Sequence, residues 1–255
     1  MADRSKIEWL AGGATWNFAI GCTPTRIGCG QCYAGKFATR HCSNPTQRDY
    51  YGSGIAHRGR FTGKVKILQH KLAPPFPWRK KPGLVFVNSM GDTFHDQVPS
   101  DVIRRCLEIV RDHPEQHFIM LTKRPRRANE FWEDTPKAPR HLRNLTIGVS
   151  CSVQEDYDDL WSDLVGCPAY HAISLEPLLG HVHLQRGADW VIVGAETGQK
   201  ARPCDPLWMA RVVDQCCRMS VPVFVKKAPP GAERLEVVRE YPRALEAILK
   251  PKGAD

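Results

Sequence analysis

Seven short segments of the chain are apolar at consecutive positions and rich in Val, Ile and Phe. This pattern is typical of parallel strands buried on both faces, because strands with one solvent-exposed face alternate apolar and polar residues. Parallel strands need long crossover connections, so the pattern predicts an α/β fold. The expected strands are residues 15–20, 84–88, 117–121, 145–149, 170–175, 190–193 and 221–225.

Amphipathic segments between these strands predict crossover helices. Residues 100–111 follow Pro99, begin with a capping Ser and place apolar residues at helical spacing. Residues 154–164 and 206–219 have the same character. Strand and helix alternate at the spacing of barrel units, so we expect a parallel (βα) partial barrel. A doubly wound open sheet is the alternative.

A polar and basic segment separates the first two expected strands. Residues 37–82 are irregular in pattern and end in a Pro-rich run. We interpret them as a long insertion within a single domain that spans residues 1–255, and residues 240–255 as a helix and tail.

The formal net charge is +9, from 36 Lys and Arg against 27 Asp and Glu. This charge favours nucleic acid as a partner, because phosphates neutralised by a protein release counterions; an ordinary basic enzyme is the alternative. No apolar run approaches the about 20 residues that span a bilayer, so we expect a cytoplasmic protein with no membrane contact. The basic residues cluster as His57, Arg58, Arg60, Lys64 and Lys66; Arg79, Lys80 and Lys81; and Lys123, Arg124, Arg126 and Arg127.

Three of the ten cysteines, Cys22, Cys29 and Cys32, stand close together in a C-x6-C-x2-C pattern. Disulfides are not the default explanation in a reducing compartment. The three lie on a Gly- and Pro-containing loop after the first strand, ahead of a helix expected from about residue 34. An iron–sulfur cluster needs thiolates from one short loop, and glycines let the backbone approach its sulfides. Three ligands would leave one iron open.

Two other interpretations of the cysteines stay open. A structural zinc site normally has four ligands, so His41 or Cys42 would have to supply the fourth. A redox disulfide between Cys29 and Cys32 would leave Cys22 unexplained.

The cysteine segment and several strand-end motifs resemble a phage- and prophage-encoded three-cysteine family. Its members are similar to radical S-adenosylmethionine enzymes and distantly to spore photoproduct lyase. The first gap is six residues here instead of the usual three, and the aromatic residue, Tyr33, follows the last cysteine. The resemblance covers about residues 7–227 and includes the motifs at 7–9, 15–17, 21–34, 87–94, 121–125, 148–150, 175–180, 193–198 and 202–203.

The resemblance implies a 4Fe-4S cluster on the three cysteines, with S-adenosylmethionine on the fourth iron. An external electron donor such as flavodoxin would reduce the cluster, and a 5′-deoxyadenosyl radical would then take a hydrogen atom from the substrate. The cofactor would be bound by Tyr33, Ser89, Gly91, Asp92, Ser150 and Ser152. The segment of Ser89, Gly91 and Asp92 would receive its amino group, and Ser150 and Ser152 its ribose.

The expected catalytic residues are Glu176, Glu196 and Lys123. The two acids follow apolar strands, where an unpaired carboxylate is costly to bury, so each needs a partner or ligand. Lys226 is one expected partner. Lys123 or Arg124 would hold the methionine carboxylate or a substrate phosphate.

The expected function is a radical S-adenosylmethionine isomerase or lyase that rearranges, modifies or repairs a nucleic acid base. A modified thymine or other pyrimidine in phage DNA is the favoured substrate, and DNA is favoured over RNA. The alternatives are the same chemistry on a free nucleotide or peptide, and a zinc-stabilised nucleic-acid-binding protein without catalysis. Trp16, Tyr50, Tyr51 and Trp78 would either stack on an extruded base or pack in the core.

Overall fold

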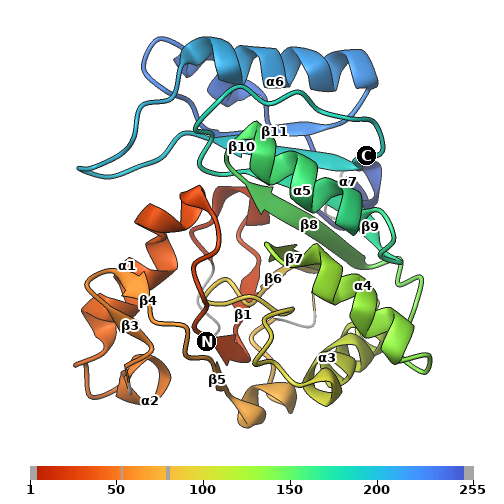
Figure 1. Cartoon of the computed structure of the whole chain (residues 1–255). Coiled ribbons are helices and arrows are strands. Elements are labelled where there is room, and N and C mark those ends of the chain that lie inside the picture. The colour runs from red at the N-terminus through yellow and green to blue at the C-terminus, as the bar shows by residue number, and fades with distance from the viewer. Residues whose placement is uncertain (1–4, 53, 79–80, 250–255) are drawn as a thin grey trace.

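The computed structural model describes residues 5–52, 54–78 and 81–249. Its main feature is a sheet of seven strands, all paired in parallel (Figure 1). The strands are β1 (Ala14–Trp16), β6 (Gly83–Val87), β7 (Gln116–Thr122), β8 (Leu145–Cys151), β9 (Tyr170–Leu175), β10 (Trp190–Gly194) and β11 (Val223–Lys227).

The order of the strands distinguishes the two expected architectures. A doubly wound sheet reverses its strand order at a switch point. Here the order is β1-β6-β7-β8-β9-β10-β11, so neighbours along the chain are neighbours in the sheet throughout. The sheet curls into a half-barrel, and its edge strands β1 and β11 are not paired with each other in the described residues. The predicted parallel (βα) partial barrel is confirmed.

Four helices cover the outer face of the half-barrel (Figure 1). Three of them were expected, but α4 was not, because its first turn was interpreted only as a basic cluster. Its buried Ala128, Phe131 and Trp132 follow helical spacing, and Pro125 stands at its first turn. Pro99, not Ser100, occupies the cap position of α3, without a side-chain cap. The helices are α3 (Ser100–Asp112), α4 (Pro125–Asp134), α5 (Gln154–Leu164) and α6 (Pro206–Met219).

The inner face of the sheet is filled by residues from both ends of the chain. Trp9 and Leu10 of the 3-10 helix η1 (Glu8–Leu10) and Leu245 of helix α7 (Arg243–Leu249) belong to one buried cluster with Phe86 and Trp190. The Trp9 ring lies 4.9 Å from Phe86 and 6.1 Å from Trp190, between ring centroids. These residues, Trp9, Leu10 and Leu245, form an inner plug that covers the concave face of the sheet.

The first predicted strand, residues 15–20, is divided in two. Strand β1 ends at Trp16, and β2 (Ala19–Ile20) pairs antiparallel with β5 (Lys66–Ile67) outside the main sheet. Asn88 causes the division: its Oδ1 accepts hydrogen bonds from the Phe18 and Ala19 backbone N–H groups, both at 3.0 Å. The chain therefore leaves the sheet before it reaches Cys22.

The insertion is more ordered than its composition predicted. It holds the end of helix α1, a hairpin and several short elements, and it packs Ile55, Phe61 and Leu68 in a small core with Ala34 and Ala38 of α1. Arg79 and Lys80 of the second basic cluster lie outside the described residues. The elements are α1 (Tyr33–His41), α2 (Arg48–Tyr51), β3 (Ala56–His57), β4 (Arg60–Phe61), β5 and η3 (Gln69–Leu72).

Two of the four aromatic residues that were expected either to stack on a base or to pack in the core do the latter. Trp16 is fully buried, and its Nε1 donates to the Lys71 carbonyl at 2.8 Å. Trp78 packs against it with ring centroids 5.3 Å apart.

None of the described helices combines the length and apolar composition that crossing a bilayer requires.

Candidate active site

The segment from Cys22 to Tyr33, here called the cysteine loop, lies across the carboxyl ends of the strands. At one end, the Tyr33 hydroxyl donates to the Ser89 carbonyl, just after β6, at 2.5 Å. In the middle, the Arg202 guanidinium, from the segment after β10, donates to the Ile27 carbonyl at 3.0 Å. The loop therefore spans the end of a parallel barrel where active sites are built.

Glycines hold the start of the cysteine loop against the segment that follows β6. The Gly21 N–H donates to the Met90 carbonyl at 3.0 Å, and Gly21 forms an isolated parallel bridge with Gly91. A Cβ on Gly91 would lie 2.8 Å from the Ala19 carbonyl oxygen, closer than real Cβ contacts allow. Gly91 is thus required for backbone packing, whether or not it also binds a cofactor.

The three clustered cysteines are half-buried free thiols. Burial, assisted by the Asp92 charge and opposed by Arg124, raises the pKa of Cys22 to about 11. Within the described residues, no group of three or more His, Cys, Asp or Glu side chains is placed to hold a metal ion. The three thiols nevertheless share one loop that spans the mouth of the half-barrel.

Helix α1 separates the clustered cysteines from both candidate fourth ligands of a zinc site. Its nine residues, Tyr33–His41, extend about 13 Å at 1.5 Å per residue. Cys42 follows the helix, and its thiol donates to the Thr39 carbonyl at 3.1 Å. The His41 ring packs on Phe37, with centroids 4.2 Å apart. The hypothesis of a four-ligand zinc site completed by either residue is therefore not supported.

Asp92 is a buried carboxylate that contacts four protein groups. Its Oδ1 accepts from the Thr122 hydroxyl at 2.8 Å and from the Phe94 N–H at 3.0 Å. Its Oδ2 accepts from the Lys123 N–H at 3.0 Å and pairs with Arg124 Nη1 at 3.4 Å. A carboxylate has about four lone-pair sites, so these four contacts occupy all of its acceptor capacity. The contact of Asp92 with a cofactor amino group stays a prediction, and the geometry favours a positioning role.

Arg124 connects the end of β7 to the cysteine loop. Besides Asp92, its guanidinium lies 3.7 Å from the Cys22 sulfur and donates to the Thr23 carbonyl at 3.1 Å. Neighbouring Lys123 instead donates from Nζ to the Ser150 hydroxyl at 2.6 Å. The structure thus brings together two predicted site residues, Lys123 and Ser150, and uses Arg124 to hold the loop.

Both strand-end acids are paired. Glu176, after β9, forms an ion pair with Lys226 at 2.8 Å, which confirms the expected partner. Glu196, after β10, binds Arg202 through two side-chain contacts of 2.6 and 2.9 Å. Hydrogen bonding from Arg202 lowers the pKa of Glu196, so this acid is a stable carboxylate at neutral pH. Catalytic roles for the two acids stay predictions.

Sequence reasoning missed Asn17 and Arg26 as residues that shape the site. Asn17 accepts the Met90 N–H on its Oδ1 at 3.0 Å. His95, which the sequence left open between lining the pocket and a structural role, lies with Nε2 2.9 Å from the Thr23 hydroxyl. Arg26 of the cysteine loop pairs with Asp159 of α5 at 2.8 Å. The available signal for Asn17 was its place as a polar residue directly after an apolar strand. Arg26 had no such signal, because its partner Asp159 is far away in the sequence.

The contact between Gly28 and Ser152 provides a test of how the loop is seated. A Cβ on Gly28 would lie 2.4 Å from the buried Ser152 hydroxyl, whereas a Cβ on Gly30 would meet nothing nearer than 3.9 Å. We expect Gly28→Ala to lower the free energy of unfolding by about 1–3 kcal/mol through overpacking. Gly30→Ala, the matched control, should change it far less. Equal effects in urea denaturation would contradict this seating of the loop.

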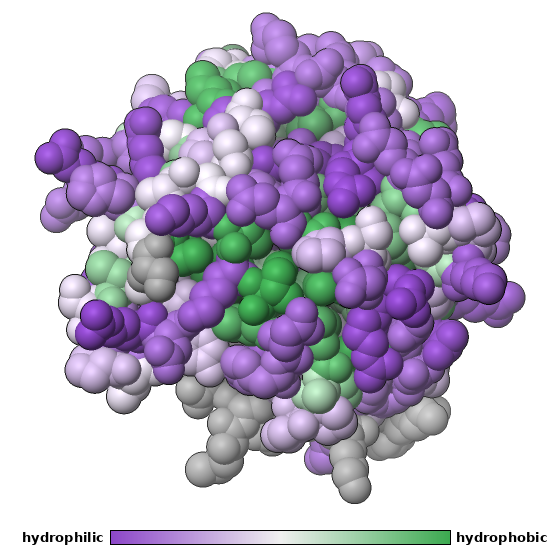
Figure 2. Space-filling view, turned by 60° about the horizontal axis from the view of Figure 1, so that its bottom comes forward, coloured by the Kyte–Doolittle hydropathy of each residue, from purple (hydrophilic) through white to green (hydrophobic). Residues whose placement is uncertain are grey.

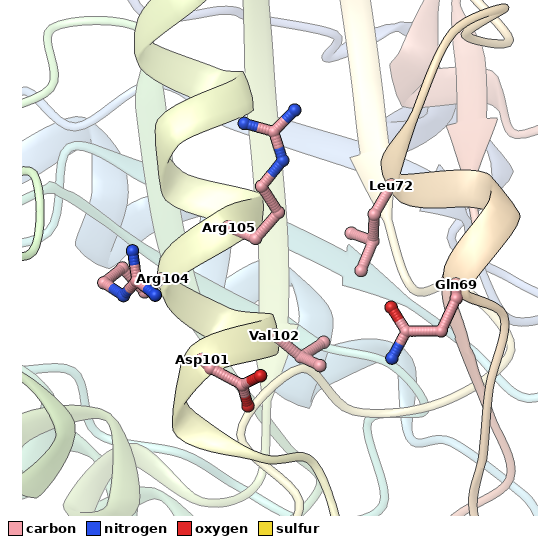
Figure 3. Close-up of a pocket in the computed structure, with 6 residues that line it drawn as sticks. All are labelled: Gln69, Leu72, Asp101, Val102, Arg104 and Arg105. Atoms are coloured by element: carbon pink, nitrogen blue, oxygen red, sulfur yellow. The ribbon is translucent and has the colours of Figure 1, made fainter.

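A surface cavity of ≈ 310 Å³ lies elsewhere, between η3 and the first turns of α3 (Figure 3). Gln69 and Leu72 line one side of it, and Asp101 and Arg105 the other. None of its lining residues is a strand-end or cysteine-loop residue. A view from the lower side of Figure 1 shows hydrophobic side chains in a hollow bordered by hydrophilic ones (Figure 2). The cavity between η3 and α3 adds no group to the candidate site.

Comparison with known proteins gives a family and a distant structural likeness. Residues 4–244 match the sequence model of DUF5131, described as a protein of unknown function. No curated protein matches the chain. A solved structure of a spore photoproduct lyase mutant is similar, with a TM-score of 0.44 and 11% sequence identity. The likeness covers 84% of this chain and 63% of that one.

Proposed function

Because the chain belongs to the DUF5131 family, whose description assigns no function, we propose from the site itself that it is a radical S-adenosylmethionine enzyme. The observation that carries the proposal is the cysteine loop, which brings three free thiols to the carboxyl mouth of a parallel half-barrel. His41 and Cys42, the two fourth ligands considered for a closed zinc site, stand at the far end of α1 from Cys32. This donor set fits a cluster with three protein ligands and one open iron.

A 4Fe-4S cluster with bound S-adenosylmethionine would supply a 5′-deoxyadenosyl radical for hydrogen abstraction. Cys22, Cys29 and Cys32 would hold the cluster. Arg124 places a guanidinium 3.7 Å from the Cys22 sulfur, and Asp92 fixes that guanidinium. Arg124, held by Asp92, would therefore position the first ligand, and its positive charge would offset the negative charge of a thiolate.

The remaining strand-end groups would bind the cofactor and substrate. Tyr33 and Ser89 are joined at the entrance of the site, and Ser150 is held by Lys123. We assign these groups to the cofactor, with Lys123 available to its carboxylate or to a substrate phosphate. Ser152 lies beneath Gly28 and is almost fully buried, which favours a packing role over contact with the ribose.

A nucleic acid base is the substrate class that we propose, with DNA favoured over RNA. The net charge of +9 supports a polyanionic substrate. Rearrangement, modification or repair of a pyrimidine by an isomerase or lyase reaction fits a site that generates a radical. The same chemistry on a free nucleotide or peptide is the alternative, and the charge favours it less.

Anaerobic reconstitution tests the proposal. With iron and sulfide the protein should become brown, and with reductant and S-adenosylmethionine it should release 5′-deoxyadenosine. Addition of DNA should change the rate or yield of that release, whereas free nucleotides and peptides should not. A colourless protein that binds zinc and releases no 5′-deoxyadenosine would contradict the proposal.

A further inference from the structure

The hairpin of β3 and β4, residues 56–61 and here called the basic hairpin, is a strained and positively charged element beside the cysteine loop. Its two strands pair Ala56 with Phe61 and His57 with Arg60, which leaves Arg58 and Gly59 as the turn. Their φ angles are 48° and 80°. Positive φ at both central residues is typical of a type I′ turn, which normally takes Asn-Gly or Gly-Gly.

Arg58 is therefore a long basic residue in a backbone conformation that favours Gly or Asn. Such strain costs about 1 kcal/mol or more and tends to persist where a side chain has a function. The Arg58 and Arg60 side chains are exposed, as is Lys64 just beyond the hairpin. None of the three makes a salt bridge within the described part of the chain. Their charges are thus available to a ligand.

Packing against α1 fixes the basic hairpin at the mouth of the half-barrel. A Cβ on Gly35 would lie 2.8 Å from the Gly59 carbonyl oxygen, and the Gly59 N–H donates to the Thr39 hydroxyl at 3.0 Å. On the other side, the Gly63 N–H donates to the Cys22 carbonyl at 3.1 Å. The hairpin and the irregular segment that follows it therefore border the cysteine loop directly.

Lys36 extends this positive charge toward the strand ends. Its side chain lies beside the turn, 3.3 Å from the position of a Cβ on Gly59. Its charge also contributes, after Arg202, to the lowered pKa of Glu196 at the end of β10. Arg58, Arg60 and Lys36 thus form a continuous basic strip that leads from the hairpin to the candidate active site.

We propose that the basic hairpin binds the phosphodiester backbone of DNA and so places the substrate base at the mouth of the half-barrel. This inference deepens the proposed function and rests on it for the identity of the substrate. One arginine guanidinium can bind two phosphate oxygens at once, so the two arginines beside the turn glycine suit a phosphodiester backbone. A duplex held here would have to turn its target base out of the stack to reach the site.

The double variant Arg58→Gly with Arg60→Gln tests the proposal, because Gly suits the positive φ of the turn and keeps the hairpin folded. Binding of a labelled random-sequence DNA duplex is measured by fluorescence anisotropy over a salt series. Loss of two phosphate contacts should weaken binding roughly tenfold and reduce the salt slope by about 2. The thermal unfolding midpoint should not fall.

The matched control is Lys137→Gln with Arg143→Gln, which removes the same charge from exposed residues before β8, at the amino ends of the strands and so opposite the cysteine loop. This control should keep the parent's affinity and nearly all of its salt slope. Equal losses in both double variants would overturn the proposal, because they would show a general charge effect. Absence of DNA binding by the parent would overturn it as well.

Failure of the hairpin proposal and failure of the proposed function give different results. If the parent releases 5′-deoxyadenosine but binds DNA independently of the hairpin, only the hairpin proposal is wrong. If it releases none, yet DNA binding depends on the hairpin, the hairpin proposal stands and the radical chemistry is wrong. Measuring DNA binding with both the reconstituted protein and its cluster-free Cys22→Ala variant separates the two cases.

Discussion

Replacing Cys22, Cys29 or Cys32 by Ala, one at a time, is expected to abolish iron loading and the release of 5′-deoxyadenosine. In the proposed cluster, each of the three thiolates would hold one iron alone, so loss of one thiol would leave that iron without a protein ligand. Asp92 cannot substitute for Cys22, because its oxygens are occupied by four protein groups. Iron and sulfide content after anaerobic reconstitution measures the effect.

Two other cysteines serve as controls for this series. Cys42 lies beyond α1, and Cys151 is fully buried at the end of β8, where burial raises the pKa of its thiol to about 12. Cys42→Ala and Cys151→Ala should therefore keep the iron. Loss of iron in Cys42→Ala would favour a closed four-ligand site and contradict the three-ligand proposal.

Asp92→Asn is expected to lower the free energy of unfolding by about 3–5 kcal/mol, because it leaves a buried guanidinium without its counter-charge. The Arg124 and Asp92 side chains are only 9% and 6% exposed. The amide that replaces the carboxylate also cannot accept from all of Thr122, Phe94 and Lys123. Urea denaturation of the metal-free protein under reducing conditions measures the loss.

An exposed ion pair provides the matched control. Asp214 and Arg218 are closer, at 2.8 Å, but are 59% and 69% exposed. Solvent screens such pairs, so Asp214→Asn should cost less than about 1 kcal/mol. If Asp92→Asn were equally mild but weakened S-adenosylmethionine binding, the positioning role would be wrong. The contact with the cofactor amino group predicted from the sequence would then be favoured.

The sequence predicted the sheet well because burial on both faces leaves a simple pattern. Residues 170–175 form a strand with the predicted bounds, as do residues 154–164 and 206–219 as helices. The division of residues 15–20 could not be seen, because its cause, Asn88, is about 70 residues away. A side chain that bonds to distant backbone leaves no trace in local periodicity.

The candidate site was predictable in position but not in its contacts. Parallel strands gather the residues that follow them, so Ser89, Lys123, Ser150, Glu176 and Glu196 were expected at one edge. Lys226 was expected to pair with one of the two acids, and the structure shows that this acid is Glu176. The link between Arg124 and Cys22 joins residues about 100 positions apart and depends on where the cysteine loop lies. The order of the insertion was missed because its apolar residues are few and scattered.

The inner plug has a consequence for how the polypeptide acquires its structure. Trp9 and Leu245 pack in the same cluster, and Glu8 pairs with Arg239 at 2.6 Å, across 231 residues of sequence. Contacts between residues so far apart in sequence require a long loop to close, which costs conformational entropy and slows folding. During synthesis, the concave face of the sheet cannot be fully covered until Leu245 has left the ribosome. Until then, Trp190 and Phe86 form an exposed hydrophobic surface that a chaperone can recognise. A chain truncated before residue 245 would leave this surface permanently exposed.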